Sequence, residues 1–167
     1  DAVAVERLPH GRFRAALDEY IAEETGHEEW ILNDIRHTGG DADGVRAGEP
    51  RDATRRMVDF VYDYIAHKNP MGFFGMVLVL EGASVRLATQ GAGAVAASLN
   101  LGPESFSYLS SHGAIDQDHL VFFQRLMDEV DDSADQAAIV EVASAVFDLF
   151  AEVFRAIPHE RSLAHAV

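Results

Sequence analysis

The sequence predicts an all-α protein, a single compact helical bundle over residues 1–167, and three observations lead to this prediction. Long segments carry apolar residues at a spacing of three and four, the period of a helix with one buried face. No segment alternates apolar and polar residues with a period of two, as a half-buried strand does. The length of 167 residues and the 48% hydrophobic content suit one domain with a substantial core.

The first two expected helices are amphipathic and are separated by a glycine-rich loop. The first covers residues 12–37, with one apolar stripe formed by Phe13, Leu17, Tyr20, Ile31 and Ile35. Two consecutive glycines mark its end, and residues 38–50 are expected to be a loop. The second helix is expected over residues 52–67, before an Asn-Pro pair interrupts the chain.

Three further helices complete the predicted bundle. The third covers residues 70–90 and is apolar nearly all round, which indicates a central helix; residues 91–103 either extend it or form a separate short helix. The fourth covers about 105–130, and a turn follows at 131–136. The last covers 134–156 and is closed by Pro158. Its expected inward face is Ile139, Val142, Val146, Leu149, Val153 and Phe154.

Composition excludes several classes of function. The chain has 13 basic and 28 acidic residues and a formal charge of -15, which argues against a nucleic-acid or anionic-membrane partner. The apolar run at 71–80 is too short to span a bilayer, and no leader sequence is evident, so we expect a cytoplasmic protein. Because there is no cysteine, any metal must be bound by His, Asp and Glu.

Glu24 and His27 stand three residues apart on the apolar stripe of the first helix. Residues at this spacing are neighbours on a helix surface. Carboxylate-bridged di-iron proteins use the Glu-x-x-His spacing on their bundle helices. A surface ion pair is the alternative, and the flanking Glu23, Glu28 and Glu29 are expected to be solvated.

Glu81 is the only acidic residue between Pro70 and Pro103. An ionised, unpaired carboxylate in such apolar surroundings would cost several kcal/mol. It must therefore be protonated, paired or coordinated. Arg86 is the candidate for a structural ion pair, but at five residues' distance it faces another side of the helix.

His112, Asp116 and His119 occupy one stripe of the fourth helix, which continues into apolar residues. The histidines are about 10 Å apart along the axis, so leaning side chains could reach two metals about 3.5 to 4 Å apart. Together with the two preceding segments they give three carboxylates and three imidazoles. This donor set suits iron or manganese, and open positions on two adjacent redox metals are what O2 activation requires.

Three stretches resemble the heme-oxygenase-like di-iron oxidases and oxygenases: "EETGHEEW", "LEGAS" and "SHGAIDQDH". The resemblance spans about residues 15–126. It implies a heme-oxygenase-like α bundle and an O2-dependent oxidoreductase that attacks an amino acid, a fatty acid or a related small molecule. It also implies two iron ions bound by Glu24, His27, Glu81, His112, Asp116 and His119. Manganese in place of iron is an alternative. A homodimer in which the partner chain helps to cover the substrate pocket is also compatible with the sequence.

Two other readings stay open. A heme-degrading enzyme of the same fold needs only one axial histidine and leaves the three carboxylates unexplained. A non-catalytic metal-binding or helical interaction protein would use them as a buried polar network. A TenA-type hydrolase is disfavoured by the missing cysteine. Candidate walls of a substrate pocket are Phe74, Phe106, Tyr108 and Phe122, for each of which core packing is the alternative.

Overall fold

The computed structural model describes residues 2–158 of the chain, and this part consists of helices and connecting turns with no strand. The predicted all-α class is confirmed. The helices are α1 (Ala2–Arg7), α2 (Arg12–Glu24), α3 (Glu28–His37), α4 (Ala42–Ala47), α5 (Asp52–His67), α6 (Gly72–Leu99), the 3-10 helix η1 (Pro103–Ser105), α7 (Ser107–Met127) and α8 (Ser133–Arg155).

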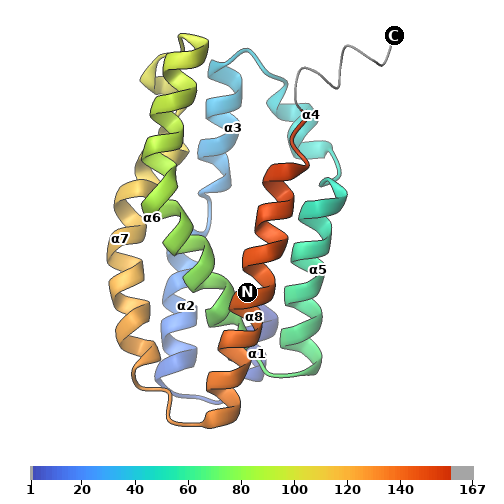
Figure 1. The fold of residues 1–167 in the computed structure, drawn as a ribbon, viewed down its shortest axis with the longest axis vertical. Coiled ribbons are helices and arrows are strands. Elements are labelled where there is room, and N and C mark those ends of the chain that lie inside the picture. Colours follow the sequence, from blue (N-terminus) through green and yellow to red (C-terminus); the bar gives the residue numbers. More distant parts are fainter. Residues whose placement is uncertain (1, 159–167) are drawn as a thin grey trace.

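The long helix α6 forms the middle of the bundle and packs against both α7 and α8, while α5 packs on the other side of α8 (Figure 1). Glycine allows the closest of these approaches. A Cβ at Gly75 would overlap with the backbone carbonyl of Ile139 and would lie 2.8 Å from the amide nitrogen of Ala143 on α8. The backbones of α6 and α8 are therefore nearly in contact at this point.

The core cluster is built mainly from buried side chains of α1, α2, α5, α6, α7 and α8. Leu17, Ile65, Phe74, Val77, Val142 and Val146 have no exposed surface, and Phe123 is 1% exposed. Phe13 and Phe74 pack edge to face, and Tyr20 packs in the same way on Phe123. These aromatic contacts fix α2 against α6 and α7, the helices that carry the remaining candidate ligands.

The predicted helix over residues 12–37 is wrong in one respect, because the structure divides it into α2 and α3. Gly26 has a φ of 99°, a left-handed conformation that favours glycine. The hydroxyl of Thr25 bonds back to the Ile21 carbonyl and ends α2. The break also shifts the buried stripe, so that Leu32 is buried and Ile31 is 39% exposed, contrary to the prediction.

Other helix boundaries also differ from the prediction. α6 extends to Leu99, so residues 91–99 continue the third predicted helix instead of forming a separate one. The residue that follows, Asn100, has a left-handed conformation. By length and composition alone, α6 is long and apolar enough to cross a bilayer, a property that core helices of bundles share. The expected loop 38–50 contains α4. Phe154 is 55% exposed rather than inward-facing, since α8 turns that side away from α5 and α6.

Candidate metal centre

Glu24 and His27 meet at the break between α2 and α3, and His112 of α7 lies beside them. Glu24 is the last residue of α2 and His27 immediately precedes α3. The Nδ1 atom of His27 lies 3.1 Å from Glu24 Oε2, and the Nε2 atom of His112 on α7 lies 3.7 Å from the same oxygen. These three side chains form a cluster whose donor atoms lie within 4.8 Å of one another.

Glu24 also belongs to a second cluster. The Nδ1 atom of His119 lies 3.7 Å from Glu24 Oε1 and 3.7 Å from Glu81 Oε1. These three donors again lie within 4.8 Å of one another. The two oxygens of one carboxylate thus face two different groups of candidate ligands, so Glu24 could contribute an oxygen to each group.

Five buried side-chain atoms of the two clusters and their surroundings have no hydrogen-bond partner among the described residues: Glu24 Oε1, Glu81 Oε2, His112 Nε2, Asp116 Oδ1 and His119 Nδ1. Buried polar atoms are rarely left without a partner, and each such exception calls for an explanation. All five belong to the residues that the sequence predicts as ligands. Their chemistry fits bound cations, because every one of them is an oxygen or nitrogen that can offer a lone pair.

Asp116 is part of neither cluster but lies in the same buried region. Its side chain is 2% exposed, and its charge acts on Glu81. Arg86, the alternative partner for Glu81, is exposed and forms no ion pair with it within residues 2–158. The structure therefore brings the six predicted residues into one region, with the Asp116 side chain close to Glu81.

The ring of His112 has a defined orientation. Its Nδ1 donates a hydrogen bond of 3.0 Å to the Tyr108 carbonyl, since a carbonyl oxygen only accepts. In the neutral ring the lone pair is then on Nε2, which lies 3.7 Å from Glu24 Oε2. Tyr108 also packs on the ring with 4.0 Å between centroids, and Trp30 stacks on His27 at 4.2 Å.

Glu81 and Tyr20 form a buried hydrogen-bonded pair. The Tyr20 hydroxyl donates to Glu81 Oε1 at 2.8 Å. Burial raises the pKa of Glu81 to about 7; the nearby Asp116 carboxylate adds to this rise, while the bond from Tyr20 and the charge of His119 oppose it. Burial and the Glu81 carboxylate raise the pKa of Tyr20, so the phenol keeps its proton.

Sequence reasoning missed three residues around the centre. Tyr20 belongs to the predicted apolar stripe, and its position four residues before Glu24 indicates that the two side chains are neighbours on α2. Glu23, expected to be solvated, lies 2.9 Å from His119 Nε2. Asp34 on α3 accepts bonds from the amides of Ser107 and Tyr108, each at 2.9 Å, and so caps α7 from another helix. No local pattern indicates such a distant cap.

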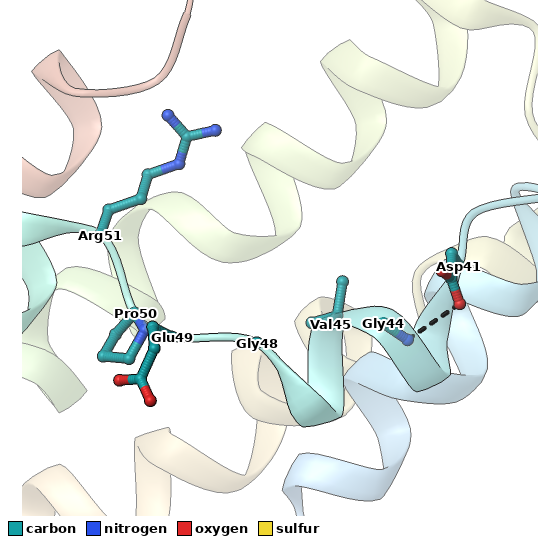
Figure 2. A pocket seen from close by; sticks show the side chains of 7 residues that line it. All are labelled: Asp41, Gly44, Val45, Gly48, Glu49, Pro50 and Arg51. Carbon is teal, nitrogen blue, oxygen red and sulfur yellow. Dashed lines mark hydrogen bonds between the residues drawn. The ribbon is translucent and has the colours of Figure 1, made fainter.

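A pocket of about 210 Å³ opens beside His119. Its other lining residues are Glu19, Tyr20, Glu23, Asp118, Phe122 and Phe123. Of the four predicted wall residues only Phe122 lines it, and Phe74 and Phe106 are buried in packing. A larger and more open hollow lies elsewhere, around α4 and the start of α5 (Figure 2); it contains none of the six candidate ligands.

Comparison with known proteins identifies the family. The sequence matches the family described as iron-containing redox enzymes over residues 2–151. The fold is similar to a crystal structure from Shewanella denitrificans OS217, described as a domain of unknown function with a heme oxygenase-like fold. The TM-score is 0.87 at 24% identity, with 99% of this chain and 72% of that chain covered. No match was found among curated proteins. The predicted heme-oxygenase-like fold is confirmed, and the chain belongs to the family of iron-containing redox enzymes.

Proposed function

We propose that this protein is a non-heme di-iron oxidoreductase that uses O2 to oxidise a small molecule. The observation that carries the proposal is the position of Glu24, whose two oxygens face two clusters of donor atoms. Glu24, His27 and His112 would hold one ion. Glu24, Glu81 and His119 would hold the other, with Asp116 beside Glu81 as a further carboxylate.

Charge supports two cations rather than one. Glu24, Glu81 and Asp116 place three carboxylates within one buried region, and no Lys or Arg pairs with any of them among the described residues. Two divalent ions would neutralise these groups and would give partners to the five unsatisfied atoms. Oxygen and nitrogen donors without thiolates suit iron, and manganese is compatible with them.

The protein residues hold and orient these ligands and limit the access of water. Tyr20 fixes the Glu81 carboxylate, and the Tyr108 carbonyl fixes His112. His112, Asp116 and Glu81 are at most 5% exposed. A pair of iron ions, when bound, supplies the electrons for reducing O2 and thereby allows oxidation of an organic substrate.

The pocket beside His119 is the route by which a small substrate would approach. It is lined by the imidazole ring of His119, one of the predicted ligands. The aromatic side chains of Tyr20, Phe122 and Phe123 also line it. Its volume of about 210 Å³ would hold a small metabolite or one end of a longer molecule. Glu19, Glu23 and Asp118 make its rim acidic, which favours a substrate group that is neutral or positively charged over a carboxylate.

Anaerobic titration with Fe(II), followed by a pulse of O2, tests the proposal. The wild-type protein should bind two Fe(II) per chain and oxidise them rapidly, with a transient absorbance change. Glu24→Ala should lose both properties, whereas Asp18→Ala, which removes an exposed carboxylate of the same helix outside the pocket, should keep them. Oxidation no faster than that of free Fe(II), or a Glu24→Ala protein that behaves like wild type, would contradict the proposal. Tight binding of hemin in place of Fe(II) would favour the heme-degrading alternative.

A further inference from the structure

The ring of His119 is held between two consecutive carboxylates of α2. Its Nε2 lies 2.9 Å from Glu23 Oε2, and its Nδ1 lies 3.7 Å from Glu24 Oε1. An ionised carboxylate only accepts hydrogen bonds, so in the neutral His119 ring the bond to Glu23 places the proton on Nε2 and leaves the lone pair on Nδ1. Nδ1 is the buried atom without a partner, and it faces Glu24 and Glu81.

We infer that Glu23 is a positioning residue: it holds His119 in the tautomer and orientation in which Nδ1 points at the metal centre, and its charge strengthens Nδ1 as a ligand. This inference rests on the proposed function. A histidine that binds a metal through one nitrogen commonly donates its other N–H to a carboxylate or carbonyl. Removal of that acceptor typically lowers metal affinity by about 10- to 100-fold.

Each of the two candidate histidines of α7 is oriented by a hydrogen bond from one ring nitrogen, but the acceptors differ. His112 donates from Nδ1 to the neutral carbonyl of Tyr108, whereas His119 donates from Nε2 to the carboxylate of Glu23. A charge-assisted hydrogen bond is shorter and stronger than a neutral one. The His119 half of the centre therefore depends on a side chain that mutation can remove, and the His112 half does not.

An ordinary surface ion pair would have a similar distance between nitrogen and oxygen, but both of its side chains would be exposed. The Glu23 side chain is 52% exposed, while the His119 side chain is only 12% exposed and its far nitrogen is buried. Exposed ion pairs usually contribute little to stability. The effect of Glu23 should accordingly appear in metal binding and in the His119 tautomer more than in the stability of the fold.

Calorimetric titration with Co(II) under anaerobic conditions, together with 15N NMR of the histidine rings in metal-free protein, tests the inference. Glu23→Ala should weaken the binding of one of the two ions by about 10- to 100-fold. Glu23→Gln, which keeps an acceptor but not the charge, should lose less. Asp18→Ala removes an exposed carboxylate from the same helix, outside the pocket and away from the ion pairs of His119 in the described part of the chain, so it should bind as wild type does.

The NMR spectra supply a readout that a purely structural role would not change. The neutral His119 ring of the wild type should be the Nε2–H tautomer, and Glu23→Ala should give a mixture of tautomers. Equal Co(II) affinities of wild type and Glu23→Ala, with an unchanged His119 tautomer, would overturn the inference and leave the proposed function intact. Failure of the wild-type protein to bind Co(II) or Fe(II) at all would instead contradict the proposed function, and the role of Glu23 with it.

Discussion

His27 Nδ1 lies 3.1 Å from Glu24 Oε2 although the helix is interrupted between the two residues. The turn that joins them depends on Gly26, whose φ of 99° suits glycine. The contact is thus made by a specific turn rather than by the regular spacing of a helix.

Replacement of Gly26 by Ala should disturb both the fold and the centre. A side chain at this φ is strained, and such strain costs about 1–3 kcal/mol. We expect a lower free energy of unfolding in urea and weaker Fe(II) binding. Gly91→Ala is the matched control: Gly91 lies within α6 with open space around its Cβ position, so the change should stabilise the protein by about 0.5–1 kcal/mol. A Gly26→Ala protein with wild-type stability would show that the turn relaxes freely.

Gly75→Ala tests the close packing of α6 on α8. The added methyl would overlap with the Ile139 carbonyl, and neither backbone can move without displacing a helix. Overpacking of this kind costs about 1–3 kcal/mol. The thermal midpoint should fall clearly below that of Gly91→Ala. Equal midpoints of the two variants would mean that α8 shifts without cost.

The metal-free protein should become less stable as pH rises from about 4.5 to above 7. Burial raises the pKa of Glu81 from 4.5 to about 7, so the folded protein binds this proton more tightly than the unfolded chain does. Its contribution is fully present below pH 4.5 and is lost as the pH passes 7; the shift corresponds to roughly 3 kcal/mol. Urea unfolding at several pH values measures the decline.

Two variants and the addition of metal ions test whether Glu81 causes this decline in stability. Glu81→Gln, which resembles the protonated form, should not show the decline, while Glu49→Gln at an exposed position should show it in full. Bound metal ions would replace the proton, so loading should also remove the decline. An identical pH dependence in Glu81→Gln and wild type would place the titrating group elsewhere.

Asp34 should stabilise α7 and, through it, the position of His112. It accepts bonds from two amides at the start of α7, and the Tyr108 carbonyl in that first turn fixes the His112 ring. Loss of a capping carboxylate costs about 0.5–2 kcal/mol. Asp34→Ala should therefore unfold at lower urea concentration and exchange the amide hydrogens of α7 faster. Asp43→Ala, a side chain that is 89% exposed, serves as the control, and equal effects of the two would rule out the cap.

The fold was predictable because its signals are local and periodic. The apolar spacing placed α5, α7 and α8 within a few residues of their observed bounds, and the isolated Glu81 in an apolar segment indicated a buried polar site. What the sequence did not indicate depends on contacts between distant segments. The break at Gly26 depends on an unusual backbone conformation. The cap by Asp34 and the hydrogen bond from His119 to Glu23 join distant segments of the chain, so a rule based on residue spacing cannot predict them.

A crystal structure of the protein loaded anaerobically with Mn(II) or Fe(II), with anomalous scattering recorded at the metal edge, tests the central claim most directly. The proposal predicts two anomalous peaks in each chain, each marking one metal ion. One ion should be bonded to Glu24, His27 and His112, and the other to Glu24, Glu81 and His119. A single peak, or peaks that leave Glu24 with no bonded ion, would contradict it.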